Sequence, residues 1–136
     1  MGESRILWEI PKFFGDRAFK EQILSLQFGA GRGIGGPETG KTSTADIVIT
    51  RKSNENSTHI YREAINGKGR DMNFYFQKVD GSTPVTYLTL RLKNAMISSH
   101  QVSTGGDVPM ETITFVHEQI EVSYSAYQRD SEGWTY

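Results

Sequence analysis

Apolar and polar residues alternate with a period of two along most of this 136-residue chain, and this pattern constrains the fold more than any other feature. Successive side chains of a β-strand point to opposite faces of a sheet, so the alternation predicts strands with one buried face. The expected strands span residues 5–10, 23–28, 46–51, 72–77, 88–98 and 111–124. We therefore expect a mainly β fold, a β-barrel or a two-sheet sandwich, in a single domain of residues 1–136.

The strand expected at residues 23–28 separates two sets of side chains. Leu24, Leu26 and Phe28 lie on one face, and Ser25 and Gln27 lie on the other. We expect the apolar set to fill the core, so that Ser25 and Gln27 point away from it.

The last expected strand changes phase within its length. Its apolar residues are odd-numbered up to Phe115 and even-numbered from Ile120 onward, and a regular strand cannot place both sets on one face. A β-bulge between Val116 and Gln119 would restore a common face, because it inserts one extra residue. The alternative is a strand that passes from one sheet to another and buries a different face in each half.

One segment follows a helical period instead, with apolar residues at Ile60, Tyr61, Ala64 and Ile65. Asn56 or Ser57 is suited to cap the start of this helix, and Gly67 suits a left-handed residue after its end. We therefore expect one short α-helix.

The glycine-rich stretch at residues 29–44 matches two nucleotide-binding patterns. Residues 35–42 match G-x-x-x-x-G-K-S/T, and residues 31–36 match G-x-G-x-x-G. Both patterns need a following helix whose N-terminus faces the phosphates. Residues 44–51 alternate at period two and predict a strand, so we expect a functional or contact loop and no nucleotide site.

Composition and spacing exclude several classes of protein. Fifteen basic and sixteen acidic residues give no basic excess for nucleic acid, and the lack of cysteine excludes disulfides and thiolate metal sites. The three histidines, His59, His100 and His117, lie singly, without metal-ligand spacing. Glu118 and Glu121 point to opposite faces of a regular strand. We expect no catalytic residues, metal or cofactor.

The apolar run near the start of the chain is too short for a signal peptide, and polar residues and a proline interrupt it. After Ile6, Leu7 and Trp8 come Glu9 and Pro11, and no later segment approaches the length of a membrane span. We expect a cytoplasmic protein with no membrane partner, which leaves the cell, if at all, without an N-terminal signal.

Several segments follow one another in a fixed order, namely residues 46–51, the short helix, and residues 92–99, 102–107, 113–115 and 120–124. In this order and spacing they resemble the Hcp family, the haemolysin-coregulated proteins that are tube subunits of bacterial type VI secretion systems. Residues 23–29 and the final Gly133-Trp134 fit the same pattern. The chain departs from it in the glycine loop and at His117, where an aromatic residue is common.

The resemblance implies a β-barrel subunit whose copies close into a hexameric ring. Rings are expected to stack into a tube that carries effectors. A contractile sheath is expected to expel this tube together with a spike protein, without the use of a signal peptide. In such rings the strand at residues 23–28 lines the channel, so Ser25 and Gln27 are expected to face cargo. The glycine loop is expected to contact neighbouring subunits through Gly31, Arg32, Gly33, Gly35, Gly36, Glu38 and Lys41.

Three other functions stay open at this point. The first is a tail-tube protein of a phage-like particle, which has the same physics in a different setting. The second is a small β-sandwich that binds a ligand such as a carbohydrate, for which Tyr75, Tyr87 or Trp134 would gather on one face. The third is nucleotide binding through residues 35–42.

Overall fold

The computed structural model describes residues 3–32, 42–44, 46–81 and 83–125, and this part of the chain is mainly β with one helix, as the sequence predicts. The elements in chain order are β1 (Glu3–Phe14), β2 (Arg17–Ile23), β3 (Ser25–Gln27), β4 (Ala30–Arg32), β5 (Thr42–Thr44), β6 (Ile47–Lys52), α1 (Ser57–Asn66), β7 (Arg70–Asp80), β8 (Thr83–Ser103), β9 (Met110–Val116) and β10 (Gln119–Tyr124).

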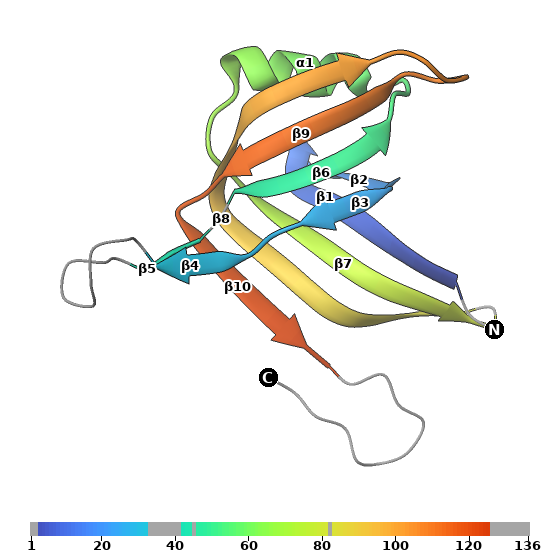
Figure 1. Ribbon diagram of the computed structural model, residues 1–136, viewed down its shortest axis with the longest axis vertical. Coiled ribbons are helices and arrows are strands. Elements are labelled where there is room, and N and C mark those ends of the chain that lie inside the picture. Colours follow the sequence, from blue (N-terminus) through green and yellow to red (C-terminus); the bar gives the residue numbers. More distant parts are fainter. Residues whose placement is uncertain (1–2, 33–41, 45, 82, 126–136) are drawn as a thin grey trace.

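Eight of the described strands form one antiparallel sheet in the order β2-β1-β7-β8-β9-β6-β3, with β10 paired to β8 beside this path. We call β2, β1, β7, residues 83–95 of β8 and β10 sheet A, and residues 96–103 of β8 with β9, β6 and β3 sheet B. Because β2 runs into β3 through Leu24 alone, the path returns to its start and the sheet curls around the core (Figure 1).

Trp8 stands at the centre of the core, where both sheets contribute aromatic rings. Its indole is fully buried, with ring centroids 4.8 Å from Phe19, 6.2 Å from Phe74 and 5.4 Å from Phe115. The other buried apolar residues are Ile10, Ile23, Ile47, Ile49, Ile60, Met72, Leu90, Leu92, Ala95 and Ile113. Except for Ile60 on the helix and Ala95 in β8, the odd or even spacing of this set follows the alternation in the sequence, strand by strand.

Strand β8 turns a different side to the core on either side of Asn94. Leu92 is buried before this residue and Ala95 after it, which an unbroken strand does not allow. Asn94 has a φ of 55°, in the left-handed region that asparagine tolerates better than most residues, and its side chain donates to Glu118 at 2.7 Å. Gly69 lies so close to the Asn94 amide that a Cβ there would collide with it.

The last expected strand is in fact two strands, β9 and β10, separated at residues 117–118. The bulge predicted there is wrong. Val116 pairs with Met96 and Gln119 pairs with Lys93. Between these two pairs each of the two strands advances by three residues, so neither contains the extra residue of a bulge. The alternative holds: β9 pairs within sheet B, and β10 pairs within sheet A.

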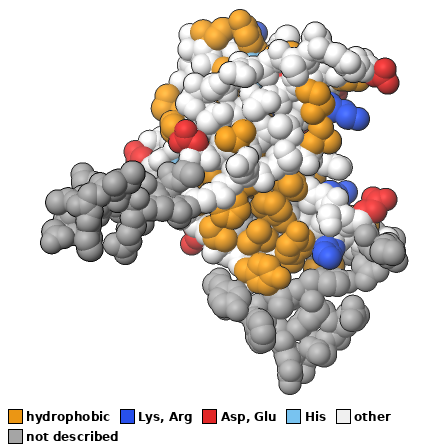
Figure 2. Space-filling view, viewed as in Figure 1, with side chains coloured by type: hydrophobic (Ala, Val, Ile, Leu, Met, Phe, Trp, Pro, Cys, Tyr) orange, Lys and Arg blue, Asp and Glu red, His pale blue; other side chains and the backbone are white. Residues whose placement is uncertain are grey.

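Strand β10 leaves part of its inner side uncovered. Phe115 of β9 is buried and Ile120 packs against the core, but Val122 and Tyr124 are 45% and 40% exposed. Figure 2 shows hydrophobic side chains gathered over this part of sheet A, between β3 and β10. Sheet B does not extend over this end of sheet A.

The N-terminal strands differ from the sequence prediction. β1 is longer than residues 5–10, and β2, where Ile23 belongs, was not predicted at all. The prediction that Leu24, Leu26 and Phe28 fill the core is wrong for two of the three. Leu26 packs against the core, but Leu24 and Phe28 are 50% and 37% exposed because β3 is a three-residue strand at the edge of sheet B.

The predicted helix is confirmed as α1, which packs against β8, but its ends differ from the prediction. Asn56 makes no capping hydrogen bond with its side chain, and Gly67 has a φ of −71°, which is extended and not left-handed. Of the helical stripe, Ile60 is buried, whereas Tyr61 and Ile65 are exposed. The described residues contain no helix long and apolar enough to cross a membrane.

The flanks of the glycine-rich stretch are strands. β4 and β5 pair antiparallel, with Ala30 opposite Thr44 and Arg32 opposite Thr42. Thr42 is the last residue of the G-x-x-x-x-G-K-S/T match, so a strand, not a helix, follows that pattern, as predicted. Residues 33–41, which hold the rest of both glycine patterns, lie outside the described residues.

We predict that Trp8→Ala lowers the free energy of unfolding by about 3–5 kcal/mol, because it opens a cavity among three aromatic rings. Trp8→Phe should cost much less. It keeps a ring in place and removes an indole N–H that has no hydrogen-bond partner among the described atoms. Urea unfolding of all three proteins at one concentration, followed by circular dichroism, measures the difference; equal losses for both variants would contradict the central role of the ring.

Candidate functional site

A charged residue is buried at the end of the core beneath α1. Ile47, Ile49 and Arg51 occupy successive inward positions of β6, and the Arg51 side chain has no exposed surface. A guanidinium stays charged in a protein, so its burial is tolerated only where its N–H groups find acceptors.

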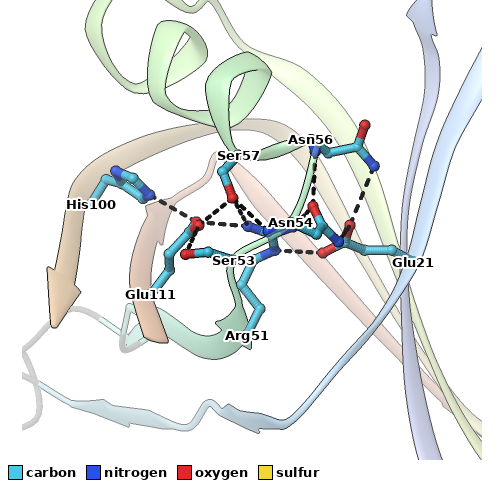
Figure 3. A network of polar contacts seen from close by, with 8 residues as sticks. All are labelled: Glu21, Arg51, Ser53, Asn54, Asn56, Ser57, His100 and Glu111. Atoms are coloured by element: carbon cyan, nitrogen blue, oxygen red, sulfur yellow. Dashed lines mark hydrogen bonds and ion pairs between the residues drawn. The ribbon is translucent and has the colours of Figure 1, made fainter. Parts of the chain in front are cut away.

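Two glutamates from other strands pair with this guanidinium (Figure 3). Arg51 Nε donates to Glu21 of β2, and Nη1 donates to Oε1 of Glu111 of β9 at 2.7 Å. Nη2 donates to Asn54 Oδ1 at 2.8 Å, and Nη1 also donates to Ser57 Oγ at 3.2 Å. Burial lowers the pKa of Arg51, but the two carboxylates outweigh it and raise the pKa above its ordinary value.

The Glu111 carboxylate, like the Arg51 guanidinium, makes several hydrogen bonds. Oε2 accepts hydrogen bonds from Ser53 at 2.7 Å and Ser57 at 2.6 Å, and Oε1 lies 2.9 Å from His100 Nε2. Burial raises the pKa of this carboxyl, but the hydrogen bonds from Ser57, His100, Ser53 and Arg51 prevail and lower it to about 2. Glu111 is therefore ionised throughout the neutral range.

The contacts in this cluster suit a structural role and not nucleophilic catalysis. Ser57, His100 and Glu111 touch, but the carboxylate lies between the hydroxyl and the imidazole. In a catalytic triad the imidazole lies in the middle, where it takes the hydroxyl proton. The cluster instead joins β2, β6, β8, β9 and the start of α1 at one point.

The alternation contained a signal for this cluster that our sequence analysis did not use. Arg51 continues the inward series of Ile47 and Ile49, and Glu111 begins the inward series of Ile113 and Phe115. Two opposite charges in inward phase on different strands suggest a buried pair. Nothing local, however, shows that these strands are neighbours, and the structure pairs Arg51 with Glu111 directly.

Ser25 and Gln27, the residues expected to face a channel, are both exposed on the outer face of sheet B. Ser25 Oγ lies 2.6 Å from Thr50 Oγ1 on the neighbouring strand. The register places further hydroxyl, amide and apolar residues on this outer face, namely Val48, Thr50, Met96, Ser99, Gln101, Ser103, Met110, Thr112, Thr114 and Val116. Lys52, at one end, is the one charged side chain among the described residues of this face.

The expected loop contacts are described only in part. Gly31 and Arg32 lie on β4, and Gly33, Gly35, Gly36, Glu38 and Lys41 lie outside the described residues. Of the three aromatic residues considered for a ligand-binding face, the two that the structure describes have different surroundings. Tyr75 donates to Glu9 at 2.7 Å, whereas Tyr87 lines a hollow with Ile6 and Phe76; Trp134 lies outside the described residues.

We predict that acid unfolds this protein partly through Glu111. Its pKa is lowered in the folded state, so the stabilisation is complete above the unfolded value of 4.5 and is lost as the pH falls from 4.5 toward 2. The loss amounts to about 3 kcal/mol. Glu111→Gln should remove most of this pH dependence and cost roughly 3 kcal/mol at pH 7, because Arg51 then keeps one carboxylate.

The matched control is Glu121→Gln on the neighbouring strand β10, where the carboxylate is 71% exposed and lies 3.8 Å from Arg91. This variant should leave both the stability and its pH dependence nearly unchanged. Urea unfolding from pH 2 to pH 7 compares the proteins; the same acid dependence in wild type and Glu111→Gln would rule out Glu111 as its source.

Comparisons with known proteins identify the fold and the family. A type six secretion system protein shares 19% identity at a TM-score of 0.77, over 93% of this chain and 87% of that chain. Hcp1 from Salmonella typhimurium shares 13% identity at a TM-score of 0.71, over 90% of this chain and 88% of that chain. A type VI secretion system effector from Yersinia pestis shares 15% identity at a TM-score of 0.69, over 96% of this chain and 98% of that chain. These identities show the fold alone, and no curated protein matches the sequence.

Membership of the family rests on the sequence itself. The family model described as "Type VI secretion system effector, Hcp" matches residues 18–124, which is most of the chain and runs from β2 to the end of β10. The resemblance noted in the sequence is therefore confirmed, and this chain belongs to the Hcp family of type VI secretion proteins.

Proposed function

We propose that this chain is a structural subunit of a type VI secretion tube, a single domain of residues 1–136 whose copies close head to tail into a hexameric ring. Rings stack into a tube that holds effectors in its channel and leaves the cell with a spike protein, driven by a contractile sheath. The subunit is cytoplasmic before assembly and extracellular after it. Family membership supports this role.

The observation that carries the proposal is the contrast between the two outward faces. The outer face of sheet B is lined by hydroxyl, amide and apolar side chains, with Lys52 as its one charged side chain among the described residues. A channel wall of this kind offers passing cargo only weak contacts at each position, and copies around a ring multiply them. No strong fixed charge would hold a protein in place.

The outer face of sheet A has the opposite character. A single cross-strand row runs from Lys20 through Glu9, Asn73 and Arg91 to Glu121, with alternating charges. Such mixed charge is typical of a surface in contact with water or with a polar partner. We assign sheet B to the inside of the tube and sheet A to its outside.

The buried cluster around Arg51 favours a structural role over a catalytic one. Every described carboxylate oxygen of the cluster accepts at least one hydrogen bond, and the cluster lies under α1 and not on the wall. The hydrogen bonds of its charged groups connect neighbouring strands to one another.

We predict that the purified protein forms rings. Light scattering coupled to size exclusion should give the mass of six copies, in equilibrium with smaller species on dilution. Negative-stain electron microscopy of the same fraction should show rings with a central hole. A monomer at high concentration, without rings, would contradict the proposed function.

We predict that Gln27→Glu weakens the retention of effectors, because it puts a ring of carboxylates on the proposed wall. Gln119→Glu adds the same charge to the outer face of sheet A, which is assigned to the outside of the tube, and should have no effect on the retention of effectors. Co-purification of effectors with each ring, together with the ring mass, measures both. Loss of rings in Gln27→Glu would show instead that the residue lies in a subunit contact.

A further inference from the structure

The proposed channel wall carries apolar side chains at one end, among its hydroxyl and amide groups. Met96 of β8 lies directly opposite Val116 of β9. Phe115 is buried, so Val116 and its partner Met96 point to the outer face of sheet B. Val48 of β6 lies diagonally beside Val116, because it pairs with Thr114, two residues earlier on β9. We call Met96, Val116 and Val48 the apolar spot.

The packing of the subunit does not account for this spot. The core lies on the opposite side of sheet B, where Ile49, Ile113 and Phe115 are buried. Met96 and Val116 are 43% and 42% exposed, so water reaches almost half of each side chain. Grouped apolar side chains on an exposed face are typical of a contact surface, and methionine adapts its shape to different partners.

A positive charge lies at the other end of the same face. Lys52 is exposed and pairs across the sheet with Met110, and Val116 follows Met110 by six residues on β9. The ammonium group and the apolar spot are therefore about 20 Å apart along the strands. Lys52 makes no ion pair with another residue that the structure describes, so its charge can act on a partner.

An acidic residue at the level of the apolar spot gives the face a direction. Asp46 is exposed just before β6, and the next residue, Ile47, pairs with Phe115, the neighbour of Val116. A carboxylate of a partner is repelled at this end and attracted at the Lys52 end. The face therefore suits a partner whose apolar and acidic groups are separated along its length.

We propose that the outer face of sheet B is a cargo site for a protein segment with two features: apolar side chains that contact Met96 and Val116, and carboxylates about 20 Å away that pair with Lys52. The inference rests on the proposed tube function and names the class of effector that the tube accepts. Each contact is weak, but copies around a ring add up for a cargo that reaches several of them. The same charge disfavours basic segments.

Peptide binding to purified wild-type rings tests the class of cargo. The probe is a fluorescein-labelled peptide with leucines in its first half and glutamates in its second half, spaced by serines. A second peptide has lysines in place of the glutamates, and a third has serines in place of the leucines. Fluorescence anisotropy should give binding of the leucine–glutamate peptide about tenfold tighter than of either other peptide. Equal affinity for all three would overturn the proposal.

Two valines of similar exposure form a matched pair of variants. Val116 is 42% exposed on the proposed wall, whereas Val122 is 45% exposed on the inner side of sheet A, opposite Leu90. Val116→Thr should weaken binding of the leucine–glutamate peptide roughly threefold, because a hydroxyl replaces a buried methyl group. Val122→Thr should leave it unchanged. An equal loss in both variants would show that the peptide does not select the wall.

The charge is tested with a second matched pair. Lys93 is exposed on the outer face of sheet A, opposite Gln119. Lys52→Gln should weaken binding of the leucine–glutamate peptide severalfold at low salt and much less at high salt, where charges are screened. Lys93→Gln should have no effect. Lys52→Glu should reverse the preference toward the leucine–lysine peptide, and an unchanged preference would exclude Lys52 from the site.

Light scattering of every variant separates the cargo site from the tube function. Rings that form but do not distinguish the three peptides would overturn the cargo site and leave the tube function standing. Loss of rings in Val116→Thr or Lys52→Gln would place that residue in a subunit contact and overturn its part in the site. Absence of rings in the wild-type protein would overturn the tube function, and the cargo site with it.

Discussion

The buried guanidinium of Arg51 is the interaction on which the arrangement of this protein depends. Its side chain has no exposed surface, so the fold loses stability when Glu21 or Glu111 no longer pairs with it. Glu21 belongs to β2, and its position next to β6 fixes the corner where β2 runs into β3. That corner determines where the two end strands of the curled sheet, β2 and β3, meet and where the edge of sheet B lies.

The strands at the margins of this fold are only partly covered by the rest of the chain. β3 follows the corner for three residues only, too few to be covered by its own chain, and Leu24 and Phe28 stay in contact with water. At the far side of sheet B the same holds for Val102 on β8. An exposed edge with apolar side chains is a hazard for a protein that works alone, but it suits one that works as part of a ring.

The long strand β8 is what lets one chain present two different outward faces. It enters as a member of sheet A and leaves as a member of sheet B, and the left-handed conformation of Asn94 marks the point where its inward side changes. The charged row ends at Arg91 and Glu121 on one side of this point, and the uncharged face begins at Met96 on the other. A single backbone irregularity therefore separates the surface assigned to the outside of the tube from the surface assigned to its channel.

The periods of apolar and polar residues in the sequence by themselves determined that the chain is mainly β, that one short helix contains Ile60 to Ile65, that a strand follows the glycine-rich stretch, and that Ser25 and Gln27 face away from the core. These features depend on the local period of side chains along the backbone. Only the tertiary structure decided that Leu24 is exposed, that Arg51 is buried, and that the last expected strand is divided into β9 and β10 at residues 117–118 without a bulge. The physical reason is that a period states which side of a strand a residue is on, whereas burial depends on which strands lie beside and above it.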